Sequence, residues 1–134
     1  MRTLFMALAL VAAQGCRPER PAEHSAAFAA RRQNRYRALD AQLQVIATQP
    51  ILINTMAKVF PLTEAGRTLV TAKLQTLQMR FDEAKNQVAL VRTCSAEQCE
   101  DVDERATDAM NRLDAAREDA WDALDKAPRT DRSS

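Results

Sequence analysis

The sequence contains little glycine and few aromatic residues. Its two glycines are Gly15 and Gly66, and Phe, Trp and Tyr together make up 4% of the chain. Because glycine supplies the positive φ angles of tight hairpins and the close backbone approach of phosphate-binding loops, its scarcity argues against both features. The 25 alanines favour helix instead, since alanine loses no side-chain freedom there. We therefore predict an all-α fold, a single small domain with a core of Leu, Val, Ile, Met and Ala.

Residues that could support catalysis are also scarce. The one histidine, His24, lies in a proline-containing segment, where it is poorly placed to act as a base for Ser25 or another nucleophile. The sequence contains no HExxH, GxSxG, P-loop or dinucleotide-binding pattern. We therefore expect no catalytic residues, no cofactor and no enzymatic activity.

Carboxylate pairs at helical spacing are the nearest approach to a metal site. They are Asp101 with Glu104, and Glu118 with Asp122. Basic residues follow several acids at the i+4 position, in the orientation that stabilises a solvated helix. These pairs are Asp101 with Arg105, Asp108 with Arg112, and Asp122 with Lys126. We therefore interpret the acids as a solvated helix face and expect no metal.

The first fifteen residues have the layout of a signal peptide. Arg2 precedes an apolar stretch over residues 4–13, which is too short to span a bilayer as a permanent helix. Residues 10–16, Leu-Val-Ala-Ala-Gln-Gly-Cys, resemble a bacterial lipoprotein leader, in which a cysteine preceded by a small residue receives the lipid. The resemblance implies that residues 1–15 are removed and that Cys16 is lipidated, with palmitate among its acyl chains. Ordinary cleavage nearby, for example after Ala13, is the alternative.

The cysteine count supports lipidation. Three cysteines in an exported protein leave one without a disulfide partner, and a lipid on Cys16 would use it. Lipoproteins with Asp directly after the lipidated cysteine are retained at the inner membrane, whereas this chain has Arg17. The resemblance therefore implies the outer membrane, facing the periplasm, with the membrane contacted through the lipid anchor.

Prolines and hydrophobic periodicity divide the rest of the chain. Pro18 and Pro21 predict an extended tether over residues 16–24. A helical bundle domain is expected over 25–127, with a first helix at about 25–48 and a short buried apolar helix at 51–60; a strand is the alternative for the latter. Two longer helices, at about 63–92 and 95–127, carry apolar residues at spacings of four and three, which predicts an antiparallel coiled-coil hairpin. Residues 128–134 are expected to form a disordered tail.

Charge is distributed unevenly along the chain. Residues 17–92 contain twelve basic and six acidic residues, and residues 93–134 contain six basic and twelve acidic, so the two halves attract. The densest single-sign feature is a basic cluster in the first helix: Arg31, Arg32, Arg35 and Arg37. Nucleic acid or anionic lipid would suit this cluster, but the acidic last helix favours internal neutralisation or a solvated face. We expect no nucleic-acid partner, and we retain the cluster as the candidate protein-binding site because one acidic helix cannot neutralise several faces. The apolar segment at 51–60 is the second candidate, should the cluster prove not to be the site.

Cys94 and Cys99 flank the turn between the two long helices. Ser95 and Gln98 have the spacing of a capping box with Ser95 as N-cap, which places the cysteines at the two positions that touch in a hydrophobic staple. A disulfide between them would stabilise the fold by roughly 2 kcal/mol in the chain-entropy estimate. A redox or metal role is the alternative, although the spacing is not that of a thioredoxin-like motif.

These observations favour an envelope-anchored lipoprotein that acts as a non-enzymatic interaction or scaffolding module, with a protein partner of unknown identity. A periplasmic stress chaperone or metal-stress protein is the second hypothesis, because residues 60–67 resemble the helix start of small periplasmic stress chaperones, with Gly66 in place of the family's glutamine. A phage-derived lysis or exclusion lipoprotein is the third.

Overall fold

The structure is a computed structural model that describes residues 2–130, with side chains described from residue 25 onward. It contains four helices: α1 (Arg2–Ala47), α2 (Gln49–Val59), α3 (Glu64–Val91) and α4 (Cys99–Lys126). Residues 2–130 form no strand, and their one β-bridge joins Leu62 to Arg129. The predicted all-α helical bundle is therefore confirmed.

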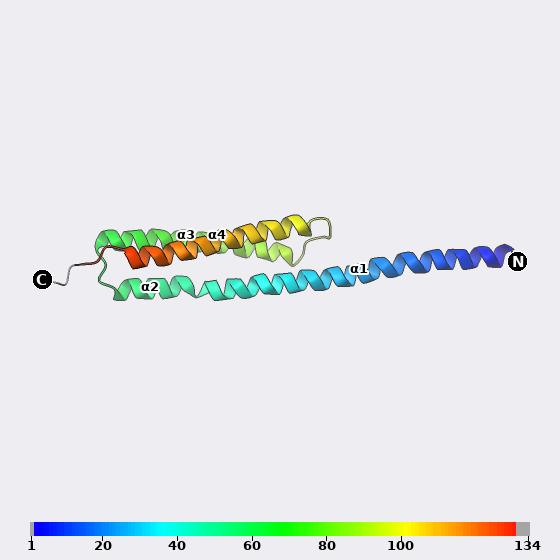
Figure 1. Ribbon diagram of the computed structural model, residues 1–134, viewed down its shortest axis with the longest axis horizontal. Coiled ribbons are helices and arrows are strands. Elements are labelled where there is room, and N and C mark those ends of the chain that lie inside the picture. The colour runs from blue at the N-terminus through cyan, green and yellow to red at the C-terminus, as the bar shows by residue number, and fades with distance from the viewer. Residues whose placement is uncertain (1, 131–134) are drawn as a thin grey trace.

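The helices form two parallel arms. α3 and α4 make an antiparallel hairpin, and α2 continues in the direction of α1 along one side of it (Figure 1). The break between α1 and α2 falls at Thr48, next to Pro50, which lacks a backbone N–H. Thr48 keeps the two helices in line because its carbonyl oxygen accepts a hydrogen bond from Leu52 N at 3.2 Å.

The hairpin supplies most of the core. Its buried residues follow the predicted seams, with Val70, Leu77, Ala84, Val88 and Val91 on α3, and Ala106, Ala109, Met110, Leu113, Ala120, Ala123 and Leu124 on α4. Alanines dominate the α4 seam, so the two helices can approach closely there. Lys73 and Asp119 add an ion pair of 2.8 Å between the helices.

The arm of α1 and α2 buries a single row of side chains against the hairpin. The row consists of Leu39, Leu43, Ile46 and Ile53. Trp121 of α4 adds a hydrogen bond, with its Nε1 donating to Gln49 Oε1 at 2.8 Å. Ile53 is the one large apolar residue of α2 that is buried, so the prediction that this whole segment is buried is wrong.

The N-terminal part of the chain also differs from the prediction. We expected an extended tether over residues 16–24 and a helix start near Ser25, whereas α1 is helical through this range. Pro18 and Pro21 each remove one backbone donor, but the Ala, Glu and Arg residues around them favour helix. The predicted signal peptide and the lipidation of Cys16 lie outside the residues whose side chains are described, and they stay predictions.

The segment after α4 is ordered as far as Thr130. Pro128 O accepts a hydrogen bond from Thr63 N at 2.9 Å, and Thr130 N donates to Pro61 O at 2.6 Å. The predicted disordered tail is therefore wrong for residues 128–130, because the extended backbone at 61–63 supplies partners for their polar groups. Residues 131–134 lie outside the described part of the chain.

Gly66 allows the segment after α4 to pack closely against the start of α3. A Cβ atom at Gly66 would lie 2.6 Å from Pro128 O, a distance too short for a real contact. Thr63 is the N-cap of α3, and its Oγ1 accepts a hydrogen bond from Gly66 N at 3.0 Å, as predicted for a threonine at this position. The end of α4 and the start of α3 are thus joined through one small residue.

Candidate functional site

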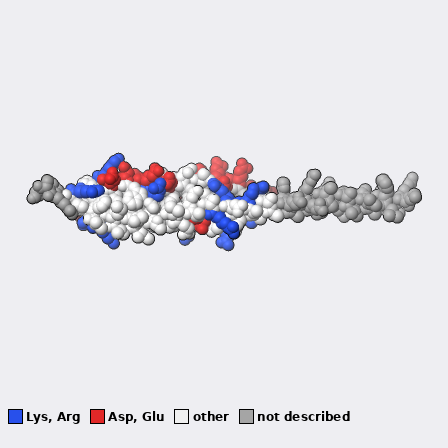
Figure 2. Space-filling model, turned by 60° about the horizontal axis from the view of Figure 1, so that its bottom comes forward, with Lys and Arg blue, Asp and Glu red and all other residues white. Residues whose placement is uncertain are grey.

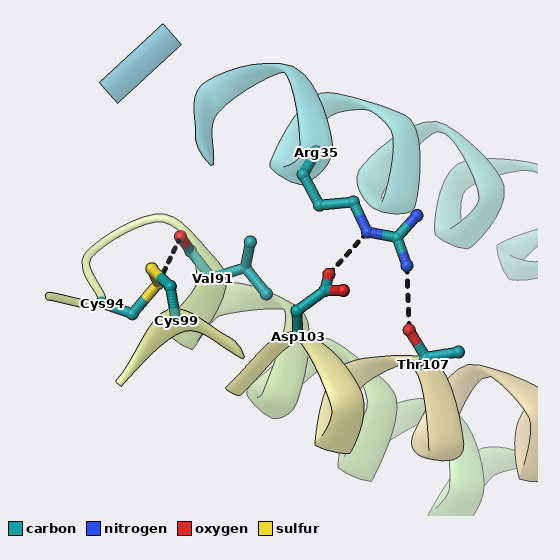
Figure 3. A network of polar contacts seen from close by, with 6 residues as sticks. All are labelled: Arg35, Val91, Cys94, Cys99, Asp103 and Thr107. Carbon is teal, nitrogen blue, oxygen red and sulfur yellow. Dashed lines mark hydrogen bonds and ion pairs between the residues drawn. A yellow bond between two sulfur atoms is a disulfide. The ribbon is translucent and has the colours of Figure 1, made fainter. Parts of the chain in front are cut away.

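The Cys94 and Cys99 sulfur atoms lie at disulfide distance across the turn between α3 and α4 (Figure 3). Their Cα atoms are 5.1 Å apart, within the range that a disulfide requires. Cys94 is buried, and its Sγ lies 3.3 Å from the carbonyl oxygen of Val91 in the last turn of α3. The predicted pairing therefore agrees with the geometry of the turn.

The predicted capping box does not form. α4 begins at Cys99 with Gln98 as its N-cap, and no side chain caps this helix. The turn is instead closed by backbone groups, since Ser95 O accepts hydrogen bonds from Gln98 N at 3.0 Å and from Cys99 N at 2.8 Å. Cys99 is thus the first residue of the helix rather than the fourth, because residues 96–98 form turns before α4 starts.

Two members of the basic cluster point toward the hairpin. Arg35 extends from α1 to α4, where its Nε lies 2.6 Å from Asp103 Oδ1 and its Nη2 donates to Thr107 Oγ1 at 2.8 Å (Figure 3). Arg32 Nη1 donates to Cys94 O at 2.8 Å. These two cations therefore hold α1 against the turn and against the acidic helix.

The other two members, Arg31 and Arg37, are exposed. Neither takes part in an ion pair with the described residues. The cluster is therefore divided: Arg32 and Arg35 contact the hairpin, and Arg31 and Arg37 remain in solvent. Of the four cations, only Arg35 forms an ion pair with the acidic helix among the described residues.

Two of the three expected i, i+4 pairs form on α4, and the structure shows no ion pair between Asp108 and Arg112 in the part of the chain that it describes. Asp101 with Arg105 and Asp122 with Lys126 are ion pairs of 3.0 Å. The hydrogen bond from Lys126 to Asp122 and the negative charge of that carboxylate raise the pKa of Lys126. Among the described residues, no group of three His, Cys, Asp or Glu side chains is arranged to hold a metal ion.

The third feature lies mainly on the apolar segment at 51–60, the second candidate for a binding site. Large apolar side chains cover the side of α1 and α2 that points away from the hairpin, and we call this set the outer face: Val45, Ile51, Leu52, Met56 and Val59. Val45, Ile51 and Val59 are 67%, 70% and 74% exposed, so these large apolar side chains contribute little to packing within the fold. One signal was present in the sequence, because the six apolar residues among 51–59 spread over more of the helix than the one side that a surface helix can bury.

Grooves run along both margins of the outer face. One groove of about 470 Å³ lies between α1 and α4 and is lined largely by polar residues, including Gln42, Gln49 and Asn111. The other, of about 290 Å³, lies between α2 and α3, and its charged residues are Lys58 and Arg67. Neither groove combines a nucleophile with a base.

None of the helices within the described residues combines the length and the apolar character needed to span a bilayer. A comparison of the chain with protein-family models, with curated proteins and with solved structures found no match.

Proposed function

We propose that this protein is a lipid-anchored, non-enzymatic interaction module of the bacterial envelope. The observation that carries the proposal is the coexistence of a closed core with large apolar side chains in solvent. The hairpin buries its apolar seams and is joined at both ends, yet the outer face stays exposed. Exposed apolar surface of this kind on an otherwise well-packed domain marks a site of interaction with another surface.

The lipid anchor rests on the leader that ends at Cys16. A diacyl or triacyl group would hold the protein stably at the membrane, which a single acyl chain does not achieve. Among the side chains that the structure describes, those buried in the hydrophobic core lie between Leu39 and Ala127, outside the segment 1–15 that processing would remove. The processed chain therefore retains the elements from which the bundle is built.

The exposed pair Arg31 and Arg37 is the proposed contact for a protein partner. These cations lie on α1, close in sequence to the anchor, and the fold leaves both without an ion pair among the described residues. A partner with complementary acidic groups would gain charge-assisted contacts without competition from the fold.

Lipidation is tested by metabolic labelling with a fatty acid, followed by the mass of the mature protein. We expect label on the natural chain, and we expect the Cys16→Ser variant to carry none and to leave the membrane fraction. An unmodified mature chain that begins at Gln14 would contradict the anchor.

The partner contact is tested separately by cross-linking in envelopes. The Arg31→Glu/Arg37→Glu variant should keep its melting temperature and lose the cross-linked partner, because both side chains lie in solvent. Unchanged cross-links in a stable variant would remove these two residues as the site.

A further inference from the structure

We infer that the outer face of α1 and α2 rests on the surface of an anionic phospholipid bilayer, so that the bundle lies against the membrane instead of extending from it. This inference deepens the proposed function, on which it rests for the presence of a membrane near α1. Three observations carry it: the position of the apolar side chains, the sign of the charges around them, and the place of the acidic residues on the molecule.

The exposed apolar side chains of α2 share the side that points away from the bundle, together with Thr55, whose Oγ1 donates to Ile51 O. Ile53 and Ala57 point into the bundle, whereas Ile51, Leu52, Met56 and Val59 are exposed. Val45 continues the same side into α1, since it lies seven residues, or two helical turns, before Leu52. A helix whose exposed sector is apolar and whose opposite side is held by a protein has the geometry of a segment lying in a membrane interface.

The charges beside α2 are of one sign, whereas the groove between α1 and α4 contains both Asp114 and Arg117. The sequence contains no Asp or Glu between Asp40 and Glu64, so α2 itself carries no acidic residue. Lys58 and Arg67 lie on the groove of about 290 Å³ at its margin, and no acidic residue lines that groove. Neither cation forms an ion pair with the described residues. Two such cations beside an apolar surface suit lipid phosphate groups, which accept hydrogen bonds from both side-chain types.

The acidic residues gather elsewhere. Figure 2, which brings the α1 and α2 side forward, shows most Asp and Glu along the upper margin with a smaller acidic spot at the lower edge, Lys and Arg mainly toward the ends, and a wide area without charge between them. A protein that lies on an anionic surface must keep its own carboxylates away from that surface. The middle of this side therefore offers an uncharged area that can approach an anionic surface.

A second copy of the chain is a less suitable occupant. If two copies met through their α2 helices, the cations beside α2 would meet uncharged residues or other cations, because α2 offers no carboxylate to pair with Lys58. The exposed side of α4 offers carboxylates, but its seam of Leu and Ala side chains is already buried in the hairpin. An anionic bilayer offers acyl chains to the apolar residues and phosphate groups to the cations.

The test uses the processed chain, which begins at Cys16, coupled through the Cys16 thiol to a maleimide lipid in vesicles. In a Trp121→Phe background, a Val59→Trp reporter is compared with a Met79→Trp reporter on α3, where Met79 is 57% exposed. With vesicles of phosphatidylglycerol and phosphatidylcholine in equal parts, the reporter at 59 should shift to shorter wavelength. It should also be quenched by doxyl-labelled lipid at least severalfold more than the reporter at 79.

Two further measurements keep the result unambiguous. The Lys58→Glu/Arg67→Glu variant should lose this quenching, as should vesicles of phosphatidylcholine alone, while circular dichroism verifies that each variant retains its helices. Equal quenching in both kinds of vesicle, or a reporter at 59 that stays as accessible to acrylamide as the one at 79, would overturn the inference. Protection of residue 59 by added envelope proteins but not by lipid would assign the outer face to a protein partner.

The synthetic anchor separates this test from the proposed function. Coupling to maleimide lipid places the chain at a membrane whether or not cells lipidate Cys16. A failure of the vesicle experiment therefore leaves the lipoprotein proposal standing, and absence of fatty-acid label in cells leaves the vesicle result standing.

Discussion

The hairpin of α3 and α4 and the arm of α1 and α2 use their apolar residues differently. In the hairpin, both seams are buried against each other, and side chains such as Leu77 and Leu113 are fully enclosed. In the arm, one row of apolar residues packs inward, and a second set of similar size remains in solvent. Hydrophobic content alone therefore does not indicate contribution to stability, because only the area removed from water stabilises the fold. The predictions below test this difference, beginning with the largest effect.

The sharpest comparison is between Leu113 on α4 and Leu52 on α2. Leu113 is fully buried and Leu52 is 47% exposed. Leu113→Ala should lower the free energy of unfolding by about 3 kcal/mol, because it removes packed methyl groups and leaves a cavity. Leu52→Ala should change it by less than about 0.5 kcal/mol. Urea unfolding, monitored by circular dichroism, measures both changes. Equal losses of unfolding free energy in the two variants would contradict the view that Leu52 contributes less to stability than Leu113.

Removal of the disulfide should have the next largest effect. Replacing both Cys94 and Cys99 with alanine should lower the free energy of unfolding by about 2 kcal/mol in the chain-entropy estimate, with helical content unchanged. The natural protein should resist thiol alkylation at these positions until a reductant is added. Adding reductant to the double variant provides the control, because it should produce no further loss. Free reaction of both thiols in the oxidised protein would show that the turn is not cross-linked.

The junction at Gly66 should be sensitive to a single methyl group. Gly66→Ala should destabilise the protein by about 1 to 2 kcal/mol, since the new Cβ displaces the Pro128 carbonyl against which Gly66 packs. The local readout is hydrogen exchange at Thr63 N and Thr130 N, which bond to Pro128 and Pro61. Faster exchange at both amides is expected. Unchanged exchange would mean that the C-terminal segment adjusts without opening.

The smallest effect should come from the charge contact between the two arms. Arg35→Ala removes the contacts with Asp103 and Thr107 and should cost about 0.5 to 1 kcal/mol, since both partners of the ion pair are partly exposed. Arg37→Ala is the matched control, because Arg37 is exposed and should contribute nothing measurable. A double-mutant cycle with Asp103→Asn isolates the pair, and a coupling energy near zero would reduce it to a surface contact.

Much of the fold follows from the periodicity of the sequence. The spacing of Val70, Leu77 and Ala84 predicts the buried side of α3, and the observed helix starts at Glu64, directly after the predicted cap Thr63. Local patterns of this kind are reliable because heptad spacing, capping and proline positions act within a few residues. The pairing of Cys94 with Cys99 belongs to the same class, as it depends on one turn.

The remaining features depend on contacts between distant segments. The sequence identifies the arginines of α1 but not which of them turn inward, since that depends on the position of α4 beside α1. The helix at 51–60 was predicted to be buried against the others because it is strongly apolar, and only the packing of a single row around Ile53 shows that its opposite side stays in solvent. The order at Pro128 likewise depends on exposed backbone groups at 61–63, far away in the sequence.

The closure of the hairpin at both ends determines how the molecule should respond to force. The Cys94–Cys99 pair ties one end, and the hydrogen bonds between residues 61–63 and 128–130 tie the other. If tension enters through the N-terminal end of α1, it first loads the contacts of Arg32 and Arg35 and then the row from Leu39 to Ile46. The arm should therefore separate from the hairpin at low force, starting at α1 and proceeding toward α2 one turn at a time, while the hairpin stays intact. In a single-molecule experiment, the closed hairpin would appear as a separate, later event.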